Sequence, residues 1–377
     1  MNNYLDENKE RNKKGVFSKN DVLSVSGDFG IVNQIELLGR SFAGKSVLDY
    51  HVVKKGNIVY TKSPLKEYPY GIVKVNNGVD GIVSTLYAVY NVKENANGQF
   101  VEYYFSLPNR INRYFKPIVR IGAKHDMKIG NDEVLANYVV FPDINEQNRI
   151  ANFVSLLDQR IATQIKIIEK LESLIRGIVE THYSQCDCIK QVRISELGEP
   201  FSTMNMSKED LSEDGNECIL YGELFTTYGC VIKEVKSRTH ISTNKATVSQ
   251  SNDLLFPTST TVDAMSLIAP SAICKEGVML GGDLFGVHVN KNYNNEYLSY
   301  LINYIYKSKL ARYAQGSTII HLHYSDIKNA TLLLPTIEEQ NYLAHIMRGV
   351  EEKINIEKDM LSKLYSQKAY LLSNLFI

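Results

Sequence analysis

The sequence lacks the features that mark secreted and membrane-spanning proteins. Its five cysteines form no CxxC pair, and an odd number of them cannot close into a disulfide framework. No apolar run approaches the roughly 18 to 20 residues that a membrane span needs. The first 20 residues are polar and charged, unlike the apolar stretch of a signal peptide. We therefore expect an untargeted protein of the cytoplasm, without a membrane segment.

The chain also lacks net charge, because 42 Lys and Arg residues balance 42 Asp and Glu residues. A nucleic-acid-binding protein of this composition would have to distribute its charge unevenly. Residues 54–128 hold 12 basic against five acidic residues, whereas residues 184–330 hold 13 basic against 16 acidic residues. If the chain binds nucleic acid, the second region reads bases with neutral groups or leaves phosphate contacts to a partner.

Motifs for metal and nucleotide chemistry are sparse. No HExxH pattern occurs, and Cys186 and Cys188 have no nearby His pair, so the spacing of a zinc site is missing. GRSFAGKS at 39–46 does match the phosphate-binding pattern GxxxxGK[ST]. That loop should begin a helix, yet VLDYHVVKKGNIVY after it is typical of a strand, a glycine turn and a strand. A P-loop NTPase with coiled-coil arms, binding phosphate through Lys45 and Ser46, is kept as the alternative interpretation.

An internal repeat with a period of about 195 residues is the most informative feature of the chain. FPDINEQNRIANF at 141–153 aligns with LPTIEEQNYLAHI at 334–346, a shift of 193 residues. Upstream, VVKKGNIVY at 52–60 aligns with VSQSNDLLF at 248–256, a shift of 196. Each half is therefore predicted to be one globular domain followed by one helix. The GKS segment has no counterpart in the second half, which argues against the NTPase interpretation.

Both predicted helices carry a heptad pattern. Each opens with a proline, an acidic residue and a Glu-Gln pair, which suits a helix N-terminus because proline needs no donor there and negative charge meets the positive dipole end. Apolar residues then recur at steps of three and four. The first seam is Val154, Leu157, Ile161, Ile168, Leu171, Ile175 and Ile178, with Gln164 at the missing position. The second seam is Met347, Val350, Ile354, Leu361, Leu364, Leu371 and Leu375, interrupted by Glu357 and Lys368.

An apolar stripe of this kind often packs only on the helix's own domain. Two repeated helices of about 35 residues, roughly 50 Å each at 1.5 Å per residue, are too long for domains of this size to cover. We therefore predict that the helices pair with each other. In an antiparallel pair, Gln164 and Glu357 would lie near mid-helix and would help to fix the register.

This order of elements resembles the specificity subunit of type I restriction-modification systems, over nearly the whole chain. The most specific carriers are the two Pro-x-x-x-Glu-Gln helix starts, at 142–147 and 335–340. The second half adds the family-like phrases ISELGE (194–199), GGDLFGVHV, NNEYLSYLIN and GSTIIHLHYSDI.

The resemblance implies an α+β fold with two α/β target-recognition domains in a pseudo-two-fold arrangement, separated by two long helices that form an antiparallel coiled coil. We expect a first recognition domain at 1–143, a central spacer helix at 144–184, a second recognition domain at 185–334 and a C-terminal spacer helix at 335–377. The first domain is expected to lack the opening strand that ISELGE provides in the second, and so to be short at its N-terminus.

In that family each domain reads one half of a split DNA target, while the helices set the spacing and dock the modification subunits. The implied partners are double-stranded DNA and two methyltransferase subunits, with restriction subunits as an additional partner. S-adenosylmethionine would bind to the partner methyltransferase, and this chain would hold no cofactor and no metal. No Asn-Pro-Pro-Tyr or Asp-Pro-Pro-Tyr run for methyl transfer to adenine is present, so we expect no catalytic residue in this chain.

Sequence is read by side chains that hydrogen-bond to base edges, whereas Lys and Arg mostly hold phosphates. Candidates in the first domain follow the strand ending at Tyr60 or surround Gly122: Lys62, Lys66, Tyr68, Tyr70, Arg120, Lys124, His125 and Lys128. Candidates in the second domain form polar, loop-like runs: Thr226, Thr227, Tyr228, Thr258, Ser259, Thr260, Gln315, Ser317, Thr318 and His321. Each also fits a solvated surface or an ordinary turn. Their position after matched landmarks of the repeat favours a reading role.

Overall fold

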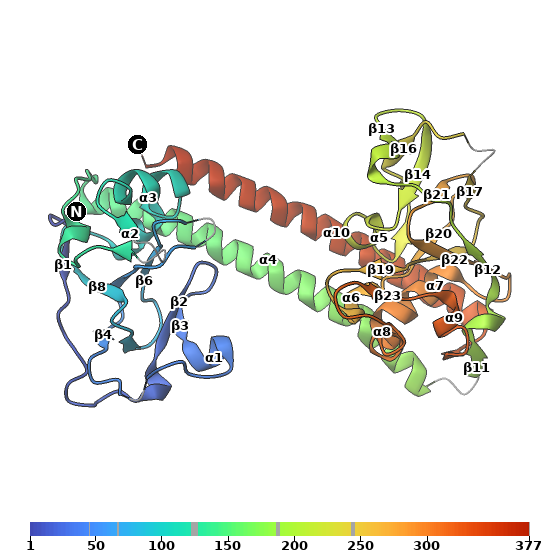
Figure 1. Ribbon diagram of the computed structural model, residues 1–377, viewed down its shortest axis with the longest axis horizontal. Coiled ribbons are helices and arrows are strands. Elements are labelled where there is room, and N and C mark those ends of the chain that lie inside the picture. The colour runs from blue at the N-terminus through green and yellow to red at the C-terminus, as the bar shows by residue number, and fades with distance from the viewer. Residues whose placement is uncertain (45, 66–67, 122–126, 186–188, 243–245, 377) are drawn as a thin grey trace. The chain divides into compact units, whose positions relative to one another are not determined.

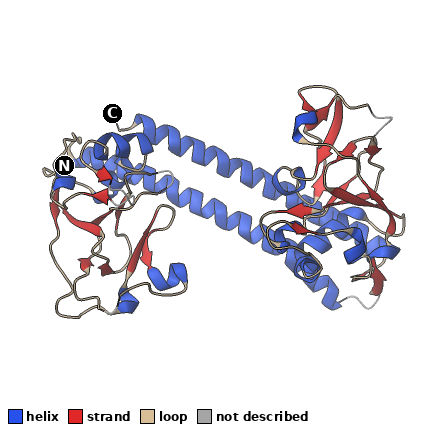
Figure 2. Cartoon of the chain, in the orientation of Figure 1, coloured by secondary structure: helices blue, strands red, loops and turns tan. Residues whose placement is uncertain are grey.

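The computed structural model describes residues 1–44, 46–65, 68–121, 127–185, 189–242 and 246–376, and it divides into two compact units (Figure 1). Unit 1 comprises Met1–Thr163 and Leu361–Ile377, and unit 2 comprises Gln164–Met360. Both units combine helices and sheets (Figure 2), so the predicted α+β class is confirmed. None of the helices in the described ranges combines the length and the apolar content that crossing a lipid bilayer requires.

Unit 1 is built on a four-stranded antiparallel sheet in the order β1-β8-β5-β6. These strands are β1 (Leu5–Glu7), β8 (Tyr87–Val92), β5 (Ile58–Thr61) and β6 (Val73–Val75). Three strand pairs accompany the sheet: β2 (Leu23–Ser26) with β3 (Gly30–Asn33), β4 (His51–Val53) with β7 (Gly81–Val83), and β9 (Arg120–Ile121) with β10 (Met127–Lys128). The short helices are η1 (Lys19–Asp21), α1 (Gln34–Leu38), α2 (Gly98–Tyr104), α3 (Pro108–Phe115) and η2 (Glu133–Leu135).

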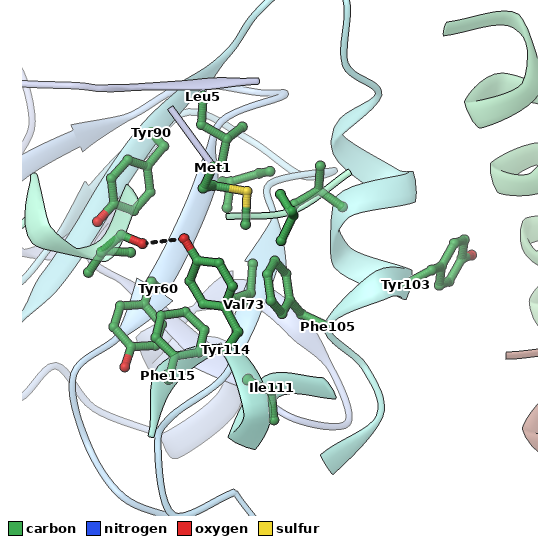
Figure 3. Packing of buried hydrophobic residues seen from close by; sticks show 14 of the residues in the cluster. Met1, Leu5, Tyr60, Val73, Tyr90, Tyr103, Phe105, Ile111, Tyr114 and Phe115 are labelled. Carbon is green, nitrogen blue, oxygen red and sulfur yellow. Dashed lines mark hydrogen bonds between the residues drawn. The ribbon is translucent and has the colours of Figure 1, made fainter. Parts of the chain in front are cut away.

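The core of unit 1 is rich in aromatic rings (Figure 3). Tyr60 from β5 stacks on Phe115 from α3, with ring centroids 4.3 Å apart and the planes within 4°. The Tyr114 hydroxyl donates a 2.8 Å hydrogen bond to the Val134 carbonyl, so this buried ring keeps its polar end satisfied. Tyr103 points away from these rings in Figure 3, and its hydroxyl donates to Asp158 instead.

Unit 2 contains two five-stranded sheets. One has the order β12-β22-β18-β20-β15, formed by β12 (Gly198–Ser202), β22 (Leu284–Val289), β18 (Asp253–Pro257), β20 (Ser271–Ile273) and β15 (Val231–Ile232). The other has the order β13-β16-β14-β21-β17, formed by β13 (Leu211–Ser212), β16 (Ser237–Thr239), β14 (Asn216–Leu220), β21 (Met279–Gly281) and β17 (Thr247–Val248). Two further pairs are β11 (Lys190–Arg193) with β24 (Thr331–Leu334) and β19 (Ser259–Thr260) with β23 (Ile320–His321). The short helices are η3 (Ile194–Glu196), η4 (Lys208–Asp210), α5 (Glu223–Thr226), α6 (Ala264–Leu267), α7 (Asn295–Leu301), η6 (Ile302–Tyr306), α8 (Lys307–Ala311) and α9 (Tyr324–Ile327).

The opening strand expected only in the second domain has a counterpart in the first. β12 pairs antiparallel with β22, with Gly198 opposite Val289. β1 pairs with β8 in the same way, with Leu5 opposite Val92. The expectation that the first domain lacks this strand is therefore wrong, because the few residues before Asn8 already supply it. The β11–β24 pair and the edge strand β15 have no counterpart among the described strands of unit 1.

Two long helices, α4 (Ile144–Gln185) and α10 (Ile337–Asn374), contribute residues to both units. Within unit 2 they run antiparallel, because the Gln164 side chain bonds to Glu357 whereas His182 lies 3.8 Å from Glu339. The Gln164 amide also donates to the Glu357 carbonyl at 3.2 Å, and both side chains are buried. The predicted antiparallel pair and the predicted register contact are confirmed. The division into recognition domains at 1–143 and 185–334 stays a prediction.

The predicted seam is buried at some positions, half-buried at Leu157, Leu171, Val350 and Leu361, and displaced by one residue near the C-termini. Val154, Ile161 and Ile354 are buried as predicted. Near the C-termini, Val179 is buried in place of Ile178, and Leu372 and Phe376 in place of Leu371 and Leu375, which are only half-buried. In unit 1 the end of α10 packs into the globular core, so an average of 3.6 residues per turn replaces the strict 3.5-residue repeat there.

The Pro-x-x-x-Glu-Gln motif has a structural explanation, because its glutamine joins each helix to the domain before it. The fully buried Gln147 side chain donates to the Pro142 carbonyl at 2.9 Å and accepts from the Asn97 backbone N–H at 2.9 Å. In unit 2, Gln340 makes the same two contacts with Pro335 and Asn294, at 2.9 and 3.0 Å. We call this pair of contacts the glutamine clamp.

Candidate nucleic-acid interface

The same loops carry the candidate residues in both units. Lys62 follows β5, and Thr258 follows the equivalent strand β18. A pair of residues six positions apart then follows in each unit: Met127 lies opposite Ile121 in unit 1, and His321 bridges to Gln315 in unit 2. The two hairpins are related by the shift of 194 residues seen between Gly122 and Gly316. The structure therefore places the candidates on equivalent elements of a repeated scaffold.

In unit 2 the three predicted polar runs converge on two neighbouring hollows. The larger, of about 750 Å³, is lined by Thr226, Ser259, Thr260 and His321 among others. The smaller, of about 600 Å³, is lined by Thr258, Gln315 and His321 among others. Residues up to 95 positions apart in the chain thus meet on one surface, with the exposed His321 side chain shared by both hollows.

Backbone hydrogen bonds hold this surface in place. The backbone N–H groups of Gln315 and His321 each donate to the other's carbonyl, at 2.9 and 2.7 Å. The N–H of Leu322 donates to the Thr258 carbonyl at 2.9 Å, which ties the hairpin to the segment after β18. Gly316 has a φ of +116°, and a Cβ there would lie 2.0 Å from the Ile319 carbonyl oxygen, so this turn requires glycine. The turn leaves Ser317 and Thr318 exposed at the tip of the hairpin.

The residues of the first polar run of unit 2, Thr226 to Tyr228, have different surroundings. Thr226 lines the larger hollow, and its hydroxyl donates to the Gly222 carbonyl at 3.0 Å. Thr227 is exposed and lies beside it. Tyr228, by contrast, packs against the core, and its hydroxyl accepts from the Lys236 backbone N–H at 3.1 Å. The structure therefore gives Tyr228 a packing role.

The candidates after β5 in unit 1 are largely occupied within the domain. The half-buried Lys62 ammonium donates to Asn131 at 2.9 Å, and burial lowers its pKa, with Arg11 adding to the effect. Tyr68 and Tyr70 pack against the core cluster, and the Tyr68 hydroxyl donates to the Ser106 carbonyl at 3.1 Å. Lys66 lies outside the described residues. This segment supplies fewer exposed groups than the sequence suggests.

In the second group of candidates in unit 1, two exposed basic side chains lie opposite each other on paired strands. Arg120 on β9 is paired directly with Lys128 on β10, and both side chains are exposed. Adjacent cross-strand cations repel each other, so an anion between them would be favourable. The candidates Lys124 and His125 lie outside the described residues.

Arg110 is a basic residue whose side chain hydrogen-bonds within unit 1. Its guanidinium donates to the Leu372 carbonyl at 3.0 Å and to the Ser373 carbonyl at 3.3 Å, and it also bonds to the Phe376 carbonyl. These carbonyls lie at and just beyond the C-terminal end of α10, where a positive charge meets the negative end of the helix dipole.

Sequence reasoning missed Asp283, which lies just before β22 and lines both hollows of unit 2. Its carboxylate Oδ2 accepts a 2.9 Å hydrogen bond from the Ser259 hydroxyl, and its carbonyl accepts one of the same length from the Thr258 N–H. The signal was the Gly-Gly pair ahead of it in GGDLFGVHV, where Gly282 has a φ of +78°. A second missed residue is Lys307, which lines the larger hollow and whose pKa is lowered by burial.

The GKS segment does not have the context of a nucleotide-binding loop. Gly39 ends α1 in the left-handed conformation, and the described chain after Ser46 passes through a turn into β4. Strand, glycine turn and strand follow as β4, Gly56 with a φ of +89°, and β5, as the sequence predicted. A P-loop would need a helix at this point. Lys45 itself lies outside the described residues.

No group of three or more His, Cys, Asp or Glu side chains in the described ranges is arranged to hold a metal ion. The titratable pair Asp253 and His288 is a 2.6 Å contact within the sheet of unit 2, and it lines neither hollow.

Comparison with known proteins places this fold among restriction-modification proteins. The family model for the type I restriction modification DNA specificity domain matches residues 189–365. The putative type I restriction enzyme MjaX specificity subunit of Methanocaldococcus jannaschii is 24% identical over 243 residues, which cover 60% of this chain and 56% of that protein. The type I restriction enzyme HindI specificity subunit of Haemophilus influenzae is 27% identical over 141 residues, covering 37% of this chain and 30% of that protein. The alignments thus span little more than half of the first relative and less than a third of the second.

Two solved structures share the fold over almost the full length. The S subunit of a type I restriction-modification system from M. genitalium superposes with a TM-score of 0.60 at 13% identity, covering 99% of this chain and 94% of that one. A chain from a structure of type I R-M complex assembly and conformational transition superposes with a TM-score of 0.53 at 15% identity, covering 99% and 97%. The DNA specificity domain is thus matched by residues 189–365, and the fold is shared with the S subunit. The chain is therefore similar to type I restriction-modification specificity subunits in part of its sequence and in its fold.

Proposed function

We propose that this chain is the DNA sequence-specificity subunit of a type I restriction-modification enzyme and that it recognises a bipartite target, with one part read by each repeat. The observation that carries the proposal is the convergence of Thr226, Ser259, Gln315 and His321 on one surface of unit 2. These side chains offer donors and acceptors suited to base edges. The equivalent hairpin of unit 1 presents Arg120 and Lys128, which suit phosphates.

The chain itself is proposed to catalyse no reaction. Methyl transfer would take place on a partner methyltransferase subunit, which would also hold S-adenosylmethionine. Two such subunits are expected, because the repeat offers two equivalent sets of helix and domain surface. Restriction subunits would join the complex in systems that also cut DNA. The assembly would act in the cytoplasm, where its DNA target lies.

The test is to express the chain with its genomic modification subunit in a host that lacks adenine methylation and to map methylated adenines by sequencing. A bipartite motif with a fixed spacer is the expected result. Gln315→Ala or Thr318→Ala should change bases in one part of the motif and leave the other part intact, because both residues belong to the unit 2 hairpin. Gln250→Ala, at an exposed position before β18 that lines neither hollow, is the matched control that should leave the motif unchanged. No methylation with a competent partner would contradict the proposal.

A further inference from the structure

Asp283 is an acidic residue in the middle of a surface proposed to meet DNA. Its side chain is exposed, and the hydrogen bond from Ser259 at 2.9 Å holds one carboxylate oxygen in place. Among the described residues, no side chain or backbone group donates to the other oxygen, Oδ1. The carboxylate is therefore fixed in position and has room for one more donor.

The strand registers identify the residue that occupies the same position in unit 1. Tyr90 of β8 lies opposite Ile58, and Val287 of β22 lies opposite Leu254. Ile58 and Leu254 are equivalent in the repeat, at the shift of 196 residues. Tyr90 is thus equivalent to Val287, and the residue four positions before each strand partner is Leu86 in unit 1 and Asp283 in unit 2.

Leu86 is also exposed, but its side chain is apolar whereas that of Asp283 is charged. The Leu86 side chain is 64% accessible although it is purely apolar. It lies in the turn between β7 and β8, where the Leu86 N–H donates to the Ser84 hydroxyl at 3.3 Å. One position of the repeated scaffold therefore presents a carboxylate in one unit and a methyl-bearing surface in the other.

These two side chains can meet only certain bases favourably. A carboxylate is repelled by phosphates and by the acceptors of guanine and thymine, and it is satisfied by the amino groups of cytosine N4 or adenine N6 in the major groove. An apolar side chain offers no hydrogen bond and is complementary to the methyl group of thymine. A wrong base would leave a buried charge unpaired, and such repulsion gives specificity as strongly as attraction does.

We propose that Asp283 and Leu86 are specificity-determining residues at equivalent positions: Asp283 restricts one base of the unit 2 half-site to adenine or cytosine on the contacted strand, and Leu86 favours thymine at the corresponding base of the unit 1 half-site. The inference rests on the proposed function, because it assumes that both surfaces meet DNA. Each contact is expected to discriminate about tenfold to a hundredfold against the wrong base.

The experiment uses the full chain assembled with its modification subunit and reads the methylated motif by sequencing. Asp283→Asn should relax one base of the unit 2 half-site, since an amide can donate to guanine or thymine as well as accept. Asp283→Glu should keep the requirement for adenine or cytosine at that base. Ser259→Ala should weaken the preference at the same base, because it frees the carboxylate to rotate. Glu276→Gln, at an exposed carboxyl in the turn before β21, removes the same charge as Asp283→Asn and should leave the motif intact.

A reciprocal exchange gives the sharpest outcome. Asp283→Leu should shift the affected base of the unit 2 half-site toward thymine, and Leu86→Asp should shift the corresponding base of the unit 1 half-site toward adenine or cytosine. An unchanged motif in both Asp283→Asn and Asp283→Leu overturns the inference while leaving the proposed function standing. Loss of all methylation in Asp283→Asn supports it if Asp283→Glu retains the original motif, and overturns it if Asp283→Glu also loses methylation. A wild-type complex that methylates no bipartite motif would instead remove the proposed function itself.

Discussion

The two units are alike where they meet their helices and differ away from them. The glutamine clamp joins Gln147 to Asn97 at 2.9 Å in unit 1 and Gln340 to Asn294 at 3.0 Å in unit 2. About three turns further along each long helix, a tyrosine hydroxyl donates to a helix carboxylate in both units. Tyr103 donates to Asp158 at 2.8 Å, and the equivalent Tyr300 of unit 2 donates to Glu351 at 2.5 Å.

Away from the helices, the same positions hold different chemistry. Asn57 donates to Asn91 at 2.9 Å between β5 and β8. The equivalent positions between β18 and β22 hold Asp253 and His288, 2.6 Å apart. A contact can thus keep its geometry while it changes from neutral amides to a titratable pair. The comparison teaches that the attachment of domain to helix is the fixed part of the repeat, whereas contacts within the sheets of the two units vary.

The largest expected effect comes from breaking the clamp. Gln340→Leu and Gln147→Leu should each destabilise their unit by about 2–4 kcal/mol, because each leaves a carbonyl and an N–H without their buried partner. The measurement is urea unfolding followed by a probe in each unit. Equal effects in the two units are expected from the matched contacts.

Gln159→Leu is the matched control, since its side chain is exposed on α4, and it should change stability by less than about 0.5 kcal/mol. A clamp variant that unfolds like this control would show that the helix is attached to its domain by other contacts.

Loss of the tyrosine-carboxylate hydrogen bond should reduce stability by different amounts in the two units. Tyr300→Phe is expected to cost about 1.5–3 kcal/mol, because Glu351 is poorly hydrated and loses a charged hydrogen bond. Tyr103→Phe should cost about 0.5–1.5 kcal/mol, since Asp158 keeps its ion pair with Lys368 at 2.5 Å. Denaturant midpoints of the two variants provide the measurement. Equal losses would mean that the surroundings of the carboxylates do not matter.

A smaller and more local effect is expected at the unit 2 hairpin. Gly316→Ala should loosen the turn by about 1–3 kcal/mol, because its φ of +116° and the 2.0 Å approach of the Ile319 oxygen leave no room for a methyl group. Hydrogen exchange of the Gln315 and His321 amides should rise. Gly349→Ala on α10, where a Cβ meets nothing within 4 Å, should instead stabilise the helix slightly. Unchanged exchange in Gly316→Ala would count against a rigid turn.

Stability should depend on pH through Glu351. Burial is the main reason that the pKa of Glu351 is raised above its ordinary 4.5, so the folded state binds this proton more tightly than the unfolded state does. The contribution is fully present below pH 4.5 and is lost as pH rises through the folded-state pKa. Glu351→Gln keeps the contacts without the charge and should flatten this loss in urea unfolding between pH 4.5 and neutrality.

Glu357 on the same helix is the internal control with the opposite sign. Hydrogen bonds from Lys353, and then from Gln164, lower the pKa of Glu357 below 4.5. Its contribution is present above pH 4.5 and is lost as pH falls, so Glu357→Gln should reduce the acid sensitivity of the helix pair. The same sign of pH dependence in both variants would contradict the opposite directions of the two pKa shifts.

Periodicity alone predicted much of the helical part. The repeat located both helices, and the polar interruptions Gln164 and Glu357 predicted an antiparallel register that the structure confirms. This succeeded because a seam of equally spaced apolar residues has few ways to pair. The ends of the seam were wrong by one residue, as at Val179 and Leu372, because globular packing there overrides the helix pair.

The candidate surface was harder to predict, because exposure is decided by tertiary packing. Tyr68, Tyr70 and Tyr228 looked like reading residues in polar loops, yet their rings pack against the cores. Asp283 was not predicted, because a lone acidic residue in a turn is usually solvated. Its significance depends on residues far away in the chain, such as Thr226 and His321, that line the same hollows.

The glutamine clamp has a consequence for how such proteins can diverge. Gln340 fixes the start of α10 to unit 2 through main-chain groups of Pro335 and Asn294, so the attachment does not depend on which side chains the domain carries elsewhere. Mutations in the outward loops can therefore accumulate without altering how the domain is attached to its long helix. A chain built in this way can acquire a new preference on one side while it inherits its assembly unchanged.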